Sequence, residues 1–102
     1  MTTQINIATD FSRSPAGRFR SDGPYSGERF REEILVPALT KDERVVVNLK
    51  GVLGFGSSFL EEAFGGLVRA GIAADVLRRK LTVESELKTY EQRIWKYVAD
   101  AR

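Results

Sequence analysis

The fold of this chain is decided by the stretch from Val45 to Glu62, which reads VVVNLKGVLGFGSSFLEE. Its first five residues predict a strand, and a run of β-branched residues is typical of a central parallel strand buried on both faces. The glycine-rich segment 51–56 predicts a turn. Apolar residues then recur at helical spacing, at Leu60, Ala63, Phe64, Leu67 and Val68. A strand, a turn and a helix in this order form the first part of a parallel β-α-β unit.

The chain after this stretch predicts one further strand between helices. Gly71 stands where a left-handed cap would end the first helix. A short helical segment is expected at 73–79 and a third parallel strand at 80–85. The closing helix, at 87–100, presents one apolar face made of Leu87, Tyr90, Ile94, Tyr97 and Val98.

The chain before this stretch predicts a hairpin and a helix. Residues 4–9 alternate polar and apolar, as a half-buried strand does. The segment 18–21 is then interpreted as the return strand, with Phe19 pointing inward. Ser26 is a good N-cap for a helix over 26–36, and Pro37 should bend or end that helix near residue 36.

These elements predict an α/β fold in the order β-β-α-β-α-β-α. Strand–helix–strand units imply right-handed crossovers and a mostly parallel sheet, which the early hairpin makes mixed. A chain of 102 residues has the size of one domain, so residues 1–102 are expected to fold as a single unit. Ligands and partners of such folds gather at the carboxyl ends of the strands, where the turn at 51–58 is expected to lie.

The composition favours binding over catalysis. The chain has no histidine and no cysteine, which removes the commonest general base, thiolate metal ligands and disulfides. Acidic residues show no calcium-loop spacing, and we expect neither a metal nor a cofactor. We therefore expect that the protein is not an enzyme.

Charge and hydropathy bear on location and partners. The basic residues are interspersed with acidic ones and the net charge is only +2, which does not favour nucleic-acid binding. No apolar run is long enough for a membrane helix, and the N-terminus lacks the features of a signal peptide. We expect a soluble, cytoplasmic protein.

Two serines follow the glycine turn, and we assign them different roles. Ser58 and Glu61 match the spacing of a capping box, which assigns Ser58 to the helix cap. Ser57 is not needed for that box, and its hydroxyl would lie at the positive end of the helix dipole. The glycines either make a tight turn or let backbone amides approach a phosphate there. The candidate binding residues of this turn are Gly54, Phe55, Gly56, Ser57 and Ser58.

Arginines concentrate in the early segment and leave two interpretations open. The candidate residues are Arg18, Arg20, Asp22, Tyr25 and Arg29. Arginine forks beside glycine backbone could clamp a phosphate or a carboxylate-rich partner. Alternatively, Arg18 and Arg20 protect an edge strand while Arg29 and Arg31 are solvated helix positions.

Aromatic residues in the last helix also leave alternatives open. Trp95 and Tyr97 are interpreted as core and rim packing. Together with Phe30 and Phe64 they could instead line the face of a homodimer.

The stretch 45–60 resembles the central motif of the STAS domains of anti-sigma factor antagonists. Asn48-Leu49 falls at that motif's Asp-Leu pair, and Ser57-Ser58 falls at its two serines. The first of these serines is the one phosphorylated by the family's kinase, so the resemblance implies phosphorylation of Ser57. The chain differs from that motif at Gly56, where the antagonists have Asp, and at Phe59, where they have Gly.

Two longer segments resemble a STAS-like family of unknown function more closely. They are GRFRSDGPYSGERFR at 17–31 and GFGSSFLEEAF at 54–64. The resemblance implies a STAS-like fold and a regulatory, protein-binding role beside a histidine-kinase-like ATPase. The alternative is an anion- or nucleotide-binding module that uses the arginine loop and the serine turn.

Overall fold

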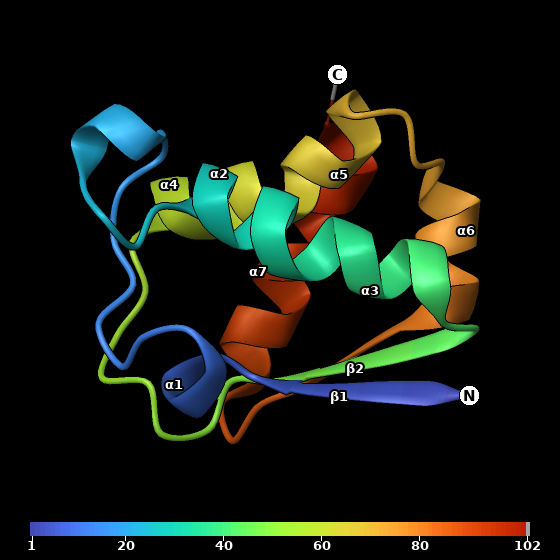
Figure 1. Ribbon diagram of the computed structural model, residues 1–102, viewed down its shortest axis with the longest axis horizontal. Helices are drawn as coiled ribbons and strands as arrows, with labels where there is room; N and C mark the ends of the chain where they lie inside the picture. Colours follow the sequence, from blue (N-terminus) through green and yellow to red (C-terminus); the bar gives the residue numbers. More distant parts are fainter. Residues whose placement is uncertain (102) are drawn as a thin grey trace.

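Three parallel strands form the sheet in this computed structural model, which describes residues 1–101 (Figure 1). They are β1 (Thr2–Asn6), β2 (Arg44–Asn48) and β3 (Leu81–Glu84), in the order β1-β2-β3. Ile5, Val47 and Val83 are paired in register across the three strands, and all three are buried. The predicted α/β class with parallel strand pairing is confirmed.

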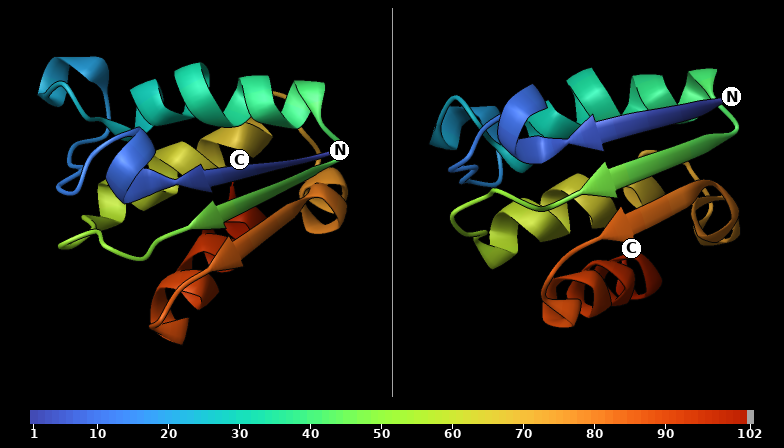
Figure 2. Two further views of the ribbon diagram at one scale, coloured as in Figure 1. Left: turned by 60° about the horizontal axis from the view of Figure 1, so that its bottom comes forward. Right: turned by 90° about the horizontal axis from the view of Figure 1, so that it is seen from below.

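Helices cover one face of this sheet (Figure 2). They are α2 (Gly27–Phe30), α3 (Val36–Lys41), α4 (Ser57–Leu60), α5 (Gly66–Arg69), α6 (Ala74–Lys80) and α7 (Lys88–Asp100). The short helix α1 (Ile7–Asp10) lies instead at the carboxyl end of β1. On the other face, Gln4, Val46 and Thr82 lie in register; Gln4 and Thr82 are exposed, and Val46 is half-buried. The predicted burial of β2 on both faces is therefore wrong, because its β-branched run packs against helices on one side only.

The predicted return strand at 18–21 is also wrong, so the sheet is parallel rather than mixed. Arg20–Asp22 form a short 3-10 helix (η1), and Phe19 is exposed instead of pointing inward. The carbonyls of Gly17 and Arg18 accept hydrogen bonds from the backbone N–H groups of Gly27 and Glu28. Because these carbonyls cap the start of α2, they are not available to a sheet.

The first strand, β1, ends at Asn6, whereas the sequence predicts a strand over 4–9. The carboxylate of Asp10 accepts the N–H of Asn6 at 2.8 Å, and the carbonyl of Ile7 accepts two N–H groups from the following turn. The chain therefore turns into α1 directly after β1.

The first long helix continues through Pro37, whereas the sequence predicts that it ends near residue 36. Between α2 and α3 lies a π-helical turn, η2 (Arg31–Leu35), in which the Val36 N–H bonds to the Arg31 carbonyl. Pro37 follows this turn as the second residue of α3, within a continuous helical backbone, so its ring removes one hydrogen bond without ending the helix. The predicted start is confirmed, since the Ser26 hydroxyl accepts the Arg29 N–H at 3.2 Å.

The second long helix has the same construction. A π-helical turn, η3 (Glu61–Gly65), joins α4 to α5. Gly71 follows with φ 106°, which confirms the predicted left-handed end of this helix. The predicted short helix and third strand correspond to α6 and β3. In α7, Ile94 and Val98 are buried, but Leu87 precedes the helix and is 58% exposed.

The two long helices cross closely at Gly27. A Cβ atom on Gly27 would stand 2.5 Å from the backbone oxygen of Phe59, which only glycine avoids. Phe30, Phe59 and Phe64 are fully buried at this crossing. Phe30 and Phe64 therefore cannot line a dimer face. Trp95 and Tyr97 are half-buried against the core, as the packing interpretation expects.

Candidate functional site

The glycine turn leaves β2 at the carboxyl edge of the sheet, where the sequence places it. Asn48 begins the turn, since its side-chain oxygen accepts the Lys50 N–H at 2.8 Å. Gly51 adopts a φ of 89°, a left-handed conformation that disfavours other residues. The Leu53 N–H donates to the carbonyl of Arg13 at 2.8 Å. The turn is thus tied to the segment that follows α1.

Ser57 is the first residue of α4 and is exposed. The N-cap is Gly56, and no side chain makes a capping hydrogen bond at this helix start. The predicted capping box of Ser58 and Glu61 is therefore wrong, because Ser58 lies inside the first turn. The Gly56 carbonyl instead accepts the N–H groups of Phe59 and Leu60.

Glu61 is held by arginines rather than by the helix start. Its carboxylate accepts hydrogen bonds from Arg69, at 2.7 and 3.0 Å, and from Arg18, at 2.5 Å. These bonds, that from Arg69 above all, hold the pKa of the Glu61 carboxyl below its usual 4.5, although burial opposes them. Arg18 comes from the early arginine segment, so this contact fastens that segment to η3.

The lowered pKa of Glu61 predicts an acid-dependent loss of stability. Because the pKa of Glu61 is lowered in the folded state, its ionised carboxylate stabilises the fold at pH values above the ordinary pKa of 4.5. This contribution is lost as the pH falls through the folded-state pKa. In urea unfolding at pH 7, Glu61→Gln should have a lower free energy of unfolding than wild type. Between pH 7 and pH 3, it should lose less of that free energy than wild type does. The control variant Glu86→Gln changes an exposed carboxylate and should lose as much free energy of unfolding as wild type. An equal loss in wild type and Glu61→Gln would contradict this assignment.

A second carboxylate, Glu62, is buried among the same arginines. It pairs with Arg31 at 2.5 Å, and the side chains of Glu62 and Arg31 are only 9% and 11% exposed. It also lies 3.2 Å from Arg18 and 3.4 Å from Arg69. Arg31 is thus no solvated helix position but the cationic partner of a buried carboxylate.

The remaining residues of the arginine segment are also engaged within the chain. Arg20 pairs with Glu32 and Glu33. The Asp22 carboxylate accepts the N–H groups of Arg18 and Phe19. Arg18 and Arg20 therefore do not converge on an open anion site, as the clamp interpretation requires. The alternative interpretation also fails, because no edge strand exists there for them to protect.

Arg29 and Tyr25 form a small stacked cluster. The Arg29 guanidinium lies over the rings of Tyr25, at 5.5 Å, and Phe11, at 5.6 Å, and donates to the carbonyl of Pro24. Tyr25 meets Phe11 edge to face. This stacking fixes Tyr25 at the surface, where it is 41% exposed.

Exposed apolar side chains lie in the connections that follow the carboxyl ends of the strands. Apart from Met1, the large hydrophobic residues found exposed in the described chain are Phe19, Tyr25, Leu53 and Leu87. Each lies in a connection that follows the carboxyl end of a strand. Figure 1 shows the segment of η1 at the upper left, the β2–α4 connection at the lower left and the β3–α7 connection at the bottom of the view. Leu53 is the most exposed, at 82%.

A cavity of about 170 Å³ opens between the glycine turn and the start of α7. Leu49, Val52 and Phe55 line it from the side of β2, and Leu87 and Tyr90 line it from the side of α7. Phe55 and Tyr90 meet edge to face, with ring centroids 5.2 Å apart. The size is below the 300–1,000 Å³ of usual small-molecule sites and does not favour a nucleotide.

The sequence singled out one wall of this cavity and missed the other. Phe55 belongs to the predicted turn, and Gly54, Gly56 and Ser57 adjoin it along the chain. For Leu87 and Tyr90 the sequence predicts only a place on the apolar face of the last helix. The available signal was topological, since the carboxyl ends of neighbouring parallel strands meet at one edge.

No described helix has the length and apolar character needed to cross a membrane.

Comparison with known proteins identifies the family. No curated protein and no solved structure matches the chain significantly. A family model described as a STAS-like domain of unknown function (DUF4325) matches residues 26–91, which span α2 to the first turn of α7. Since this match covers more than half of the sequence, the chain belongs to that STAS-like family.

Proposed function

We propose that this chain is a non-enzymatic regulatory module that binds a partner protein through the carboxyl edge of its sheet. The observation that carries the proposal is a cavity at that edge with exposed apolar residues beside it: Leu87 in its lining, and Leu53 in the turn that forms its other wall. Exposed apolar side chains around a cavity are typical of an interaction site. The lack of histidine and cysteine supports binding rather than catalysis.

The proposed partner is a histidine-kinase-like ATPase that phosphorylates Ser57. The resemblance to anti-sigma factor antagonists supports this choice, and so does the position of the serine. Ser57 is exposed at the start of a helix, next to the apolar edge, where a kinase can reach its hydroxyl. A phosphate added there would lie at the positive end of the helix dipole. Gly56 replaces the aspartate of the antagonists, so recognition would rest on the apolar edge instead.

Intact-mass analysis tests this proposal. The protein is incubated with ATP and a histidine-kinase-like ATPase of its source organism. We expect wild type to gain the mass of one phosphate and Ser57→Ala to gain none. Ser58→Ala is the matched control and should still gain one phosphate. No mass gain on wild type, or an equal gain on Ser57→Ala, would contradict phosphorylation at this site.

A further inference from the structure

The cavity beside the glycine turn has the dimensions of a site for one side chain. Its volume is about 170 Å³, and its walls are apolar and polar in about equal measure. The burial of one side chain there suits an anchor within a larger contact rather than a complete ligand site. The cavity therefore fits one residue of a partner.

The surroundings of the cavity favour a peptide over a free small molecule. Leu87, on one wall, is 58% exposed, and Leu53, in the turn that forms the other wall, is 82% exposed. A small molecule inside the cavity would leave both leucines in water. A peptide chain crossing the opening would cover them as well as fill the cavity.

The walls favour an aromatic occupant. Phe55 meets Tyr90 at 5.2 Å and Phe59 at 5.9 Å, so the cavity continues a row of rings. A further ring can pack edge to face or offset against Phe55 and Tyr90, which gives aromatic pairs added stabilisation beyond their buried area.

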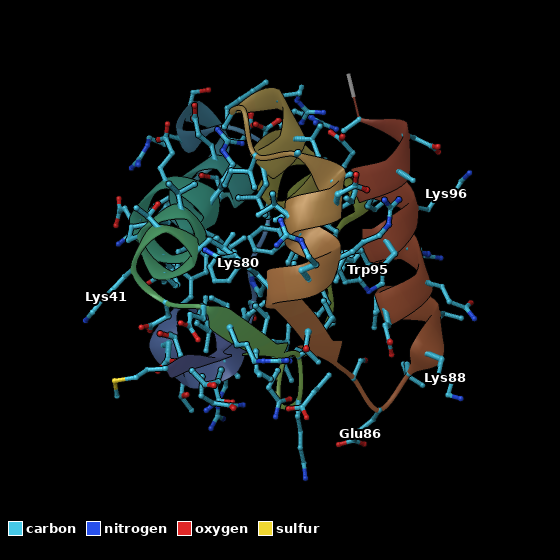
Figure 3. The ribbon with its side chains drawn as sticks, turned by 90° about the vertical axis from the view of Figure 1, so that its right-hand side faces the viewer. Lys41, Lys80, Glu86, Lys88, Trp95 and Lys96 are labelled. Atoms are coloured by element: carbon cyan, nitrogen blue, oxygen red, sulfur yellow. The ribbon has the colours of Figure 1, made fainter. Side chains whose placement is uncertain are left out.

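Two side chains of opposite charge line the cavity from different connections. Lys50 lines the cavity from the β2–α4 connection and Glu86 lines it from the β3–α7 connection, and both are exposed. Figure 3 shows Glu86 at the tip of the turn that leads into α7, with Lys88 pointing outward from the helix. A matching peptide would place an acidic residue near Lys50 and a basic residue near Glu86.

We propose that this cavity anchors one aromatic side chain of a partner peptide whose flanking residues carry opposite charges. The inference rests on the proposed function, because it names the segment by which a protein partner would be held. It concerns the apolar anchor only and does not depend on phosphorylation of Ser57.

NMR titration with short peptides tests the anchor directly. The probes are Ac-Glu-Phe-Lys-NH2, Ac-Lys-Phe-Glu-NH2, the matching alanine peptide Ac-Glu-Ala-Lys-NH2 and N-acetylphenylalaninamide. We expect the two phenylalanine peptides to shift the amide signals of Gly51, Phe55, Leu87 and Tyr90, with dissociation constants roughly in the millimolar range. One charge order should bind about two- to fivefold more tightly than the other.

Charge-swapped variants supply the decisive control. The double variant Lys50→Glu with Glu86→Lys should reverse the preference between the two peptides. The double variant Lys41→Glu with Glu43→Lys, at the opposite end of β2, should keep the wild-type preference. Shifts outside the cavity, no binding, or an unreversed preference would overturn the proposal. So would equal binding of N-acetylphenylalaninamide, which would indicate a free aromatic ligand.

The peptide titration and the phosphorylation assay together separate this inference from the proposed function. If the ATPase phosphorylates Ser57 while the peptides fail to bind, the anchor is wrong and the regulatory function stands. If the peptides bind as expected while Ser57 is not phosphorylated, the anchor is supported and the phosphorylation is wrong.

Discussion

Phe30→Ala is expected to lower the free energy of unfolding by about 3–5 kcal/mol. The Phe30 ring is fully buried, and its centroid lies 5.1 Å from that of Phe11, 5.9 Å from Phe59 and 6.4 Å from Phe64. Truncation would leave a cavity where the two long helices cross, and close helix contact at Gly27 limits how far the structure can collapse into it. Urea unfolding followed by circular dichroism measures the change.

Phe19→Ala is the matched control for this variant. Phe19 is the same residue type but is 47% exposed, so its truncation should change the unfolding free energy by less than about 1 kcal/mol. A loss at Phe19 as large as that at Phe30 would show that the segment 17–25 packs differently from the structure described here.

Glu62→Ala should destabilise the fold by a similar amount, about 3–5 kcal/mol. The reason is the charge that remains, because Arg31 is nearly buried and would lose its carboxylate partner. Arg18 and Arg69 also lie within 3.4 Å of Glu62, which leaves three guanidinium groups with less negative charge among them. Chemical denaturation at neutral pH is the appropriate measurement.

Two comparisons isolate the buried pair. Glu32→Ala removes a half-exposed carboxylate that pairs with Arg20, and it should cost less than about 1 kcal/mol. The double variant Arg31→Met with Glu62→Met removes both buried charges and should be more stable than Glu62→Ala. If the double variant is instead as unstable as the sum of the two single methionine variants, Arg31 and Glu62 are not coupled.

The parts of the fold that were predicted correctly are those with strong local patterns. The strand at 45–49, the glycine turn, the helix after it and the closing helix each combine hydrophobic periodicity with clear end signals. The predictions that failed depend on distant partners. Residues 18–21 resemble a strand, but the carbonyls of Gly17 and Arg18 cap α2. Val46 faces away from the helices because they cover one side of the sheet only.

The candidate site shows the same division between local and distant signals. The exposed position of Ser57 at a helix start follows from the glycines before it. The capping box failed because Glu61 is held by Arg18 and Arg69. The Arg18 contact joins residues 43 positions apart in the chain. The cavity exists because β2 and β3 are neighbours in the sheet, which brings Phe55 next to Tyr90. No local pattern in the sequence indicates that these two strands are adjacent.

The carboxyl edge of the sheet is proposed above as a surface for a partner protein. Isothermal titration calorimetry of the histidine-kinase-like ATPase against wild type and a Leu53→Asp, Leu87→Asp double variant tests this proposal most directly. Both leucines are exposed, so the variant should fold as wild type does. We expect wild type to bind and the double variant to bind at least about tenfold more weakly. Unchanged affinity of the double variant, or no binding by wild type, would contradict it.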